Sequence, residues 1–480
     1  MFDTPTNSSF SAATRRTNIA ELDHEHFDLI VLGAGITGAG IARDAAMRGI
    51  RTALIDKSDY GSGTSGKSSR LVHGGLRYLE TGEIKLVFEA SRERRILLRI
   101  APHLVRPRSF LFPLHRGGRI PKWKMAAGLW LYDLLSLFRN VRRHQMLSKH
   151  RLLQCEPMLK EQDLVGGARY WDAQCDDARL TLANVRSAHR HGACVANYVA
   201  VEGFDRADGR IQGAVARDAV TDRTFTIKGR VVVNATGPWS DGITGANPPN
   251  LRPTKGSHIA VQRSKVGNNE ALLVTSPLDG RVMFIIPWGN LTYVGTTDTD
   301  EPPDPDWPYA SVDDVTYLLR SINSVFPNAR LTPDDVVATW AGYRPLLKPR
   351  DPCDPSSASR EHRLLENEEG LISIVGGKLT TYRSMAAEAV DRVAQRLEHL
   401  DGRTVSRSAP TATESLPGGE TGELDVVEKE LLHDGIGPAA SRHLVRTFGT
   451  EAASILHLVQ ADRSLGESLI QGHPAIRAEI

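Results

Sequence analysis

The sequence predicts an α/β fold in which a Rossmann-like dinucleotide-binding domain is combined with a β-rich second domain and a small helical domain at the C-terminus. Three observations support this prediction: a strand, helix and strand around a glycine-rich turn near the N-terminus, a series of short strands in the middle of the chain, and short helices at its end. With 480 residues the chain is longer than a single core usually supports, so two or three packed domains are expected.

The N-terminal pattern consists of two apolar runs that enclose a segment of small residues. Residues 27–33 and 52–55 are apolar and predict two buried strands, whereas residues 36–47 predict the helix between them. The motif GAGITG occupies residues 33–38, where the first strand meets the helix. Asp56 ends the second strand at about the 20-residue spacing of a dinucleotide fold.

The glycines of this motif, Gly33, Gly35 and Gly38, have separate roles. They allow a tight turn, let the backbone approach a pyrophosphate, and let the helix pack closely against the sheet. The N-terminus of the helix offers unpaired N–H groups and a positive partial charge to the phosphates. The carboxylate of Asp56 can accept hydrogen bonds from the ribose hydroxyls. Together these features predict a bound dinucleotide rather than a helix start shaped only for packing.

The rest of the chain supplies the elements of the other domains. Residues 61–75 are rich in Gly and Ser, which indicates a loop held close to a ligand, and residues 83–100 predict a helix. Alternating strands, expected to form a sheet distinct from the first, lie at residues 199–205, 224–233, 258–261, 282–287 and 291–297. A further strand at residues 371–375 leads into a helix that ends near residue 397, and the segment 410–422 predicts a linker before the last helices.

Composition excludes several classes of protein. A formal net charge of +2 gives no reason to expect nucleic acid as a partner, and no run reaches the roughly 20 apolar residues that cross a bilayer. The four cysteines, Cys155, Cys175, Cys194 and Cys353, are scattered and have no histidine at metal-ligand spacing, so no metal site is predicted. Residues 1–26 are polar and lack the apolar stretch of a secretion signal, which indicates a disordered extension before a cytoplasmic domain.

Residues 119–145 form the most uneven segment of the sequence. Residues 125–138 are apolar apart from Asp133. Basic side chains flank this apolar run on both sides: Arg116, Arg119, Lys122 and Lys124 before it, and Arg139, Arg142 and Arg143 after it. Such a segment either docks on an anionic membrane surface or forms a helix buried against the substrate domain, and the sequence leaves both interpretations open.

Two later segments favour FAD over NAD as the dinucleotide. One apolar strand ends in Ala235-Thr236-Gly237, and another leads into GGKLTTY at residues 376–382, where a helix begins. Both resemble the elements that return the chain to the cofactor in two-domain flavoproteins. The second helix N-terminus can stabilise the negative charge that collects on the N1–C2=O edge of a flavin on reduction, a role that a nicotinamide domain does not need.

The segment SSRLVHGGLRYL at residues 68–79 closely resembles a signature of the FAD-dependent, quinone-linked glycerol-3-phosphate dehydrogenases. Further segments resemble their counterparts in that family in the same order: DDARL at 176–180, NATGPW at 234–239, KGSH at 255–258, IPW at 286–288, GTTD at 295–298, GYRPL at 342–346 and residues 376–383. The resemblance covers roughly residues 27–400. It implies a fold of the glutathione-reductase or D-amino-acid-oxidase type.

The implied domain organisation is discontinuous. FAD-binding segments are expected at about 27–115, 165–250 and 365–400, and substrate-domain segments at about 116–164 and 251–364. Residues 410–480 are expected to form the helical domain. Because the family usually continues with further helices where this chain stops, at residues 475–480, this domain is expected to be incomplete.

The resemblance also implies roles for individual residues. The positions that hold the substrate phosphate correspond to Arg77, Tyr78 and Arg360, whose residue types suit a dianion. The positions that line the reactive face of the flavin correspond to His258, Arg344 and Lys378. The implied cofactor-binding residues are Gly33, Gly35, Gly38, Asp56, Thr64, Ser65, Ser68, Ser69, Leu71, Gly74, Gly75, Ala235, Thr236, Gly237, Gly377, Lys378, Leu379 and Thr380.

The activity that the resemblance implies is oxidation of sn-glycerol 3-phosphate to dihydroxyacetone phosphate, with hydride transfer to FAD and onward transfer of the electrons to a membrane quinone. The resemblance implies a cytoplasmic protein that associates peripherally with the inner face of the cytoplasmic membrane. The resemblance is also compatible with a homodimer. Two alternatives stay open: an FAD-dependent oxidase that uses oxygen on glycerol 3-phosphate or on an amine, and a flavin-binding sensor without turnover.

Oxidation at C2 needs a general base for the hydroxyl proton, and His258 is the preferred candidate. Histidine has an ordinary pKa of about 6.5 and is mostly neutral at pH 7. Arg344 stays protonated and is expected to stabilise the developing alkoxide and then the ketone oxygen. Lys378, close to other cations, is the competing base.

Overall fold

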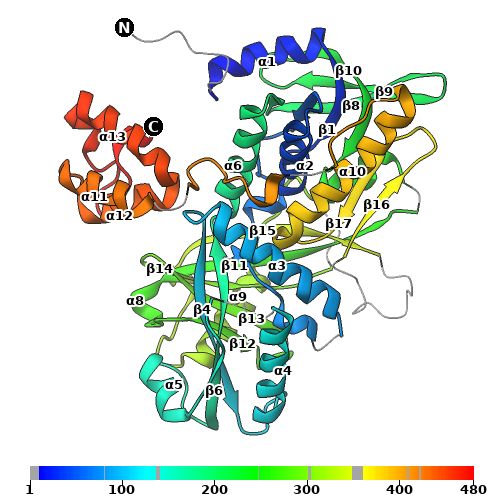
Figure 1. Ribbon diagram of the computed structural model, residues 1–480. Coiled ribbons are helices and arrows are strands. Elements are labelled where there is room, and N and C mark those ends of the chain that lie inside the picture. Colours follow the sequence, from blue (N-terminus) through cyan, green and yellow to red (C-terminus); the bar gives the residue numbers. More distant parts are fainter. Residues whose placement is uncertain are drawn as a thin grey trace.

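The structure is a computed structural model that describes residues 10–79, 82–136, 141–246, 248–300, 304–348, 361–407, 410–420 and 423–480; for Arg77 and Leu79 it describes the backbone alone. In Figure 1 the first sheet and its helices occupy the upper part of the view and the second sheet occupies the lower part. The C-terminal helices lie to the left. In the described part of the chain no helix is long and apolar enough to cross a membrane.

The first sheet is built around β1 (His26–Leu32), which pairs in parallel with β2 (Thr52–Ile55) and with β10 (Arg223–Asn234). Three further strands complete the order β16-β17-β10-β1-β2-β7, namely β7 (Cys194–Ala196), β16 (His362–Glu366) and β17 (Ile372–Gly376). Residues 29–32 of β1 are all buried, because both faces of this sheet are covered.

Different elements cover the two faces of the first sheet. One face packs against three helices: α2 (Ile36–Met47), α6 (Asp177–Arg190) and α10 (Tyr382–Asp401). The other face packs against α1 (Ala12–His24) and a hairpin of β8 (Val199–Ala207) and β9 (Arg210–Asp218). The predicted strand, helix and strand of the dinucleotide fold are therefore present, with boundaries within one residue of those predicted.

The second sheet has the order β15-β11-β14-β13-β12-β4-β6-β3, and β5 pairs with β6. Its strands are β3 (Leu71–Val72), β4 (Val105–His115), β5 (Gln145–Leu147), β6 (Leu164–Cys175), β11 (Leu251–Gln262), β12 (Ala271–Thr275), β13 (Val282–Trp288), β14 (Leu291–Gly295) and β15 (Val336–Leu347). One face packs against α5 (Lys149–Cys155) and α9 (Val312–Val325). The other face packs in part against α3 (Ile84–Ile100) and α4 (Lys122–Leu135).

Two predictions about sheet membership were wrong. The strands predicted at 199–205 and 224–233 belong to the first sheet, because β10 pairs with β1 through the apolar residues 231–233. Conversely, β4 and β6 lie within the segments predicted as FAD-binding, 27–115 and 165–250, but they pair with each other and, through β12, with the second sheet. The pairing partner of a strand is distant in sequence, so the local pattern did not reveal it.

The prediction that residues 1–26 are disordered is wrong for residues 12–24, which form α1. Ser11 caps this helix through a capping box with Thr14, which satisfies the first N–H groups. Leu22 is buried against the first sheet, and Arg15 Nη2 lies 2.6 Å from Asp218 Oδ1. Residues 1–9 lie outside the described part of the chain.

The C-terminal residues form three helices with a core of their own: α11 (Leu424–His433), α12 (Pro438–Phe448) and α13 (Ala452–Ala461). Arg186 and Arg190 of α6 both form ion pairs with Glu451, which fastens this domain to the first domain. The segment predicted as a linker is also fixed at its start, because Arg43 of α2 donates hydrogen bonds to the carbonyls of Thr411 and Glu414.

Candidate active site

A cavity of about 530 Å³ lies between the two sheets and is lined by residues of both domains. Its first part follows the glycine turn. Gly33 has a φ of +93°, a conformation that favours glycine, and a Cβ at Gly38 would lie only 1.8 Å from the carbonyl oxygen of Gly33. The turn is therefore tight enough to bring the backbone of Gly33 and Gly35 to the cavity wall.

Asp56 lies at the end of β2, where the turn and the second strand meet. Its carboxylate accepts hydrogen bonds from the backbone N–H of Ala34 at 2.7 Å and of Ser58 at 2.9 Å. Burial raises the pKa of Asp56 above its ordinary value, and these two hydrogen bonds oppose that shift. The residue lines the cavity, and a carboxylate has further acceptor capacity for ribose hydroxyls.

Most of the predicted cofactor-binding residues line this one cavity. The exceptions are Gly38 and Gly74, whose missing side chains serve packing: a Cβ at Gly74 would lie 2.3 Å from the hydroxyl oxygen of Tyr132. The segments after β10 and β17 both return to the cavity, with Ala235 and Gly377 at its wall. A tight glycine turn, an acid and two returning segments together fit a dinucleotide that extends along the cavity.

At the other part of the cavity, His258, Arg344 and Lys378 come together with Tyr78. Lys378 reaches it from the segment after β17, and its Nζ lies 3.3 Å from the centre of the Tyr78 ring. This distance allows a strong cation–π contact, which stabilises the protonated ammonium.

Arg344, on β15, donates hydrogen bonds to three consecutive residues of the segment that follows β14. Its Nη1 lies 3.1 Å from Asp298 Oδ1, and its Nη2 donates to Thr296 Oγ1 at 2.7 Å and to the carbonyl of Thr297 at 3.2 Å. The guanidinium lies directly on the backbone of Gly256, where a Cβ would be 2.2 Å from Nη2. No role was predicted for Asp298 or Thr296, although their GTTD segment is one of those that carry the resemblance.

His258, on β11, is 2% exposed and lies parallel to the indole ring of Trp340, with the ring centres 4.9 Å apart and the planes at 6°. Its Nε2 forms a 2.9 Å hydrogen bond with the hydroxyl of Ser69. Burial, followed by the charges of Arg344 and Arg70, lowers the pKa of His258 to about 3. The expectation of an ordinary histidine pKa was therefore wrong, and the ring is neutral across the physiological range.

Two of the residues expected to hold the substrate phosphate are not fully described. Arg77 lies in a short helical turn (Leu76–Leu79) beside the cavity, and the structure describes only its backbone. Arg360 lies outside the described residues altogether. Tyr78 is buried and lines the cavity, and its role at the substrate phosphate stays a prediction.

The end of the cavity next to the second sheet is apolar and aromatic. Its wall includes Phe110, Tyr170, Leu273 and Phe284, all of which belong to the hydrophobic cluster that also contains Leu129 of α4. The cavity therefore has a polar part at the glycine turn, a cationic part at Arg344 and Lys378, and an apolar part toward α4.

Comparison with known proteins is consistent with this geometry. The sequence profile of the family described as FAD dependent oxidoreductase matches residues 28–404. The aerobic glycerol-3-phosphate dehydrogenase of Staphylococcus aureus (strain USA300) is 38% identical over 457 residues, which make up 92% of this chain and 81% of that protein. The chain belongs to the FAD-dependent glycerol-3-phosphate dehydrogenase family. The predicted family is confirmed, and the cofactor is FAD.

Solved structures confirm the predicted fold class. The X-ray structure of the glycerol-3-phosphate dehydrogenase from Bacillus halodurans, complexed with FAD, is similar with a TM-score of 0.78 and 34% identity, covering 95% of this chain and 82% of that chain. The L-α-glycerophosphate oxidase from Mycoplasma pneumoniae, with FAD bound, is similar with a TM-score of 0.61 and 17% identity, covering 82% and 99% respectively. The second similarity shows the fold alone.

Proposed function

We propose that the protein oxidises the C2 hydroxyl of sn-glycerol 3-phosphate to the ketone of dihydroxyacetone phosphate and passes the electrons to a membrane quinone. The observation that carries this proposal is the convergence of His258, Arg344 and Lys378 on one cavity that also contains the dinucleotide cradle. A cavity with cationic side chains suits an anionic substrate. FAD, when bound, accepts the hydride from C2.

His258 is proposed as the base that takes the C2 hydroxyl proton. Alcohol oxidation requires that this proton leave together with the hydride, so a proton acceptor must lie near the oxygen. The lowered pKa keeps His258 unprotonated, but it also makes the free ring a weaker base than ordinary imidazole. A phosphate dianion bound in the same cavity raises the proton affinity of the ring again, because opposite charge favours the protonated form.

Arg344 and Lys378 are proposed to stabilise negative charge rather than to accept the proton. Arg344 stays protonated and is held in one orientation by Asp298 and Thr296, which suits a donor aimed at the developing alkoxide. The contact of Lys378 with the Tyr78 ring stabilises its ammonium form, so it supports a charge-stabilising role for this lysine.

Recognition of the phosphate is proposed to involve the hydroxyl of Tyr78 and the guanidinium groups of Arg77 and Arg360. Tyr78 is buried at the cavity wall, and Arg77 is its chain neighbour in the same short helix. Arginine offers bidentate, charge-assisted hydrogen bonds to phosphate oxygens.

Two features support a quinone as the acceptor and a location at the inner face of the cytoplasmic membrane. The apolar residues that line one end of the cavity belong to the same hydrophobic cluster as the buried residues of α4. The outer side of α4 exposes Trp123 (74%), Trp130 (56%) and Leu134 (53%), while Lys122 and Lys124 belong to its first turn. Exposed tryptophans beside lysines suit an anionic lipid surface.

The test is anaerobic mixing of the FAD-loaded protein with sn-glycerol 3-phosphate, glycerol, glycine and proline, followed by the flavin absorbance. Bleaching by glycerol 3-phosphate alone is the expected result, and bleaching by an amino acid instead would overturn the substrate. The reduced protein is then exposed to air or to a soluble quinone. Faster reoxidation by the quinone supports the proposed acceptor, whereas faster reoxidation by oxygen indicates an oxidase.

A further inference from the structure

Residues 68–70, called the 68–70 loop below, precede β3 and form part of the cavity wall. Ser68 and Ser69 line the cavity. The next residue, Arg70, has a φ of +53°, in the left-handed region that costs free energy for any residue other than glycine. The loop therefore has a conformation that contacts with its surroundings have to stabilise.

In the first domain, the loop is held by the carboxylate of Asp177. This residue is the first of α6, and its Oδ2 accepts hydrogen bonds from the backbone N–H of Ser68 at 3.0 Å and from the Ser68 hydroxyl at 2.6 Å. Asp177 is 1% exposed. Burial raises its pKa, and the hydrogen bonds from Ser68 oppose that shift because they stabilise the ionised carboxylate. Both hydrogen bonds are charge-assisted and therefore stronger than neutral ones.

The hydroxyl of Ser68 is used within the loop and its anchor. It donates its one hydrogen to Asp177 and accepts a hydrogen bond from the backbone N–H of Arg70 at 2.9 Å. It has no second hydrogen to donate to a cofactor. Its contribution to the cavity is thus to keep the loop in shape.

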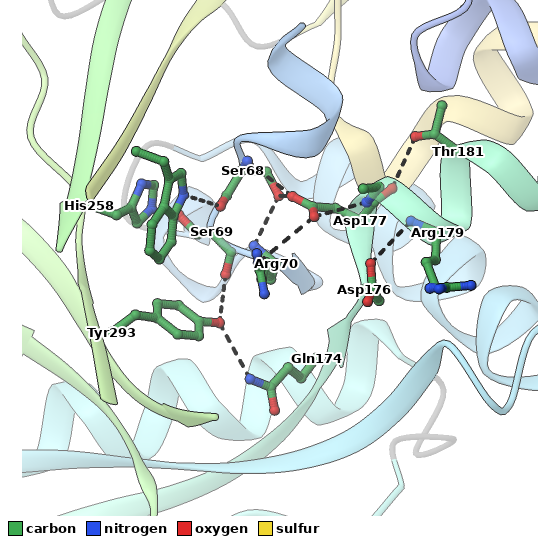
Figure 2. Close-up of polar contacts among 12 residues, drawn as sticks. Ser68, Ser69, Arg70, Gln174, Asp176, Asp177, Arg179, Thr181, His258 and Tyr293 are labelled. Atoms are coloured by element: carbon green, nitrogen blue, oxygen red, sulfur yellow. Dashed lines mark hydrogen bonds and ion pairs between the residues drawn. The ribbon is translucent and has the colours of Figure 1, made fainter. Parts of the chain in front are cut away.

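The second domain holds the same loop by its carbonyl groups. Nε1 of Trp340 donates to the carbonyl of Ser68 at 3.2 Å, and the hydroxyl of Tyr293 donates to the carbonyl of Ser69 at 3.0 Å. Figure 2 shows the loop between Asp177 on one side and Tyr293 on the other. The loop therefore bridges the two domains at the cavity wall.

The side chain of Arg70 makes the same bridge. Its guanidinium carbon lies 4.8 Å and 5.5 Å from the ring centres of Trp288 and Trp340, which belong to the second sheet. Its Nε lies 3.9 Å from Oδ1 of Asp177. Cation–π contacts on one side and the carboxylate on the other offset the cost of the left-handed backbone.

We propose that Asp177 is a positioning residue for FAD, which holds the 68–70 loop in the conformation that forms the cavity wall before the cofactor binds. Asp177 is not among the residues that line the cavity, so it acts through Ser68. A cofactor that binds one conformation of a loop loses apparent affinity in proportion to the share of molecules that have left this conformation. Loss of the anchor is therefore expected to weaken FAD binding.

The first test is titration of the FAD-free protein with FAD, with the dissociation constant taken from the quenching of flavin fluorescence. Asp177→Ala is expected to raise this constant at least tenfold, because two charge-assisted hydrogen bonds are lost. Asp177→Asn keeps one acceptor oxygen and is expected to recover part of the affinity. An unchanged constant in Asp177→Ala would overturn the proposal.

The matched control is Asp176→Ala, which removes the neighbouring carboxylate. Asp176 is the N-cap of α6 and accepts a hydrogen bond from the backbone N–H of Arg179 at 3.1 Å. Its loss is expected to lower the melting temperature of the FAD-free protein, whereas the dissociation constant of FAD is expected to stay within about twofold of the wild type. Equal weakening by Asp176→Ala and Asp177→Ala would overturn the proposal, because the stability of the helix would then explain both.

The second test is a double-mutant cycle with Ser68→Ala, read by the same titration. Ser68→Ala is expected to raise the dissociation constant several-fold in the wild-type background and to have little effect in the Asp177→Ala background. Asp177→Asn takes the place of Asp177→Ala if the latter does not fold. Equal effects in both backgrounds, or none in either, would overturn the proposal. No glycerol 3-phosphate is present, so the result decides the role of Asp177 whether or not this compound reduces the flavin.

Discussion

The imidazole of His258 occupies the space in which a side chain at Gly295 would lie, because a Cβ at that position would be 2.0 Å from Cδ2 of the ring. The two residues face each other on adjacent strands, where β11 pairs with β14. On the other neighbouring strand, Trp340 is the paired residue of His258 and stacks against it. Gly295 on β14 therefore leaves room for the imidazole ring, and Trp340 on β15 packs against the face of the ring.

Substitution Gly295→Ala is expected to displace the His258 ring and to slow flavin reduction at least tenfold, in line with the contribution of a general base. The FAD content is expected to stay unchanged, since the glycine turn and Asp56 lie in the other domain. The matched control is Gly203→Ala in β8, where a Cβ meets no atom within 4 Å. Equal rates in the wild type and Gly295→Ala would show that the ring position does not matter for the reaction.

The pH dependence of the reduction step is expected to lack an acid limb near pH 6.5. Burial and the charges of Arg344 and Arg70 lower the pKa of His258 to about 3, so the ring stays unprotonated as the pH falls through the ordinary histidine value of about 6.5. The measurement is the apparent second-order rate constant of flavin reduction at low substrate concentration, which reports the free protein, from about pH 8 down to about pH 5.5, with the profile corrected for the substrate phosphate, which titrates near pH 6. A limb at about pH 6.5 that vanishes in His258→Asn would contradict this expectation.

The variants Tyr78→Phe and Tyr78→Leu separate two roles of this residue. Tyr78→Phe keeps the ring that faces Lys378 Nζ at 3.3 Å but removes the hydroxyl, so it is expected to weaken glycerol 3-phosphate binding on the order of tenfold and to leave the reduction rate at saturation intact. Tyr78→Leu removes the ring as well and is expected also to slow reduction. Stopped-flow titration gives both quantities, and identical behaviour of the two variants would refute a role for the ring.

Acid stability is expected to depend on His103, which is 3% exposed and lies between α3 and β4. Burial lowers its pKa to about 4, so the unfolded chain binds a proton that the folded chain does not between about pH 6.5 and pH 4. Its stabilising contribution is present above pH 6.5 and is lost as the pH falls toward 4. In His103→Gln, the loss of unfolding free energy between pH 7 and pH 5 is expected to shrink by about 2 kcal/mol in denaturant titrations. An equal loss in variant and wild type would contradict the assignment.

Membrane docking through α4 is expected to depend on Trp123 and Trp130, which are 74% and 56% exposed. The double substitution to serine is expected to reduce flotation with anionic vesicles several-fold, because large apolar rings no longer enter the interface. Trp307 is 78% exposed and follows Asp306, whose side chain pairs with Lys57 just after β2 of the first sheet. Trp307→Ser is therefore the matched control for an exposed tryptophan away from α4, and it is expected to have no effect. Flotation that is equal for all three proteins would favour a helix that serves only packing.

Elements with a local sequence pattern could be predicted from the amino-acid sequence alone. The glycine turn, the helix Ile36–Met47 and the strand Thr52–Ile55 follow from spacing and periodicity within a few residues, and the structure has them as predicted. Asp56 was found for the same reason, because its distance from the turn is fixed by one strand and one helix. Most predicted cofactor residues line the cavity, since their motifs directly follow strands that end there.

The sheet that each strand joins and the surroundings of each reactive side chain depend on contacts between residues that are distant in the sequence, so local patterns could not predict them. β4 and β6 joined the second sheet through partners far away in sequence, and α1 was ordered by contacts with residues such as Asp218. Trp340 and Ser69 approach His258 from segments that are 82 and 189 residues away in the sequence. The pKa of His258 depends on this enclosure, because desolvation is a property of the packed neighbours and not of the histidine or its flanking residues.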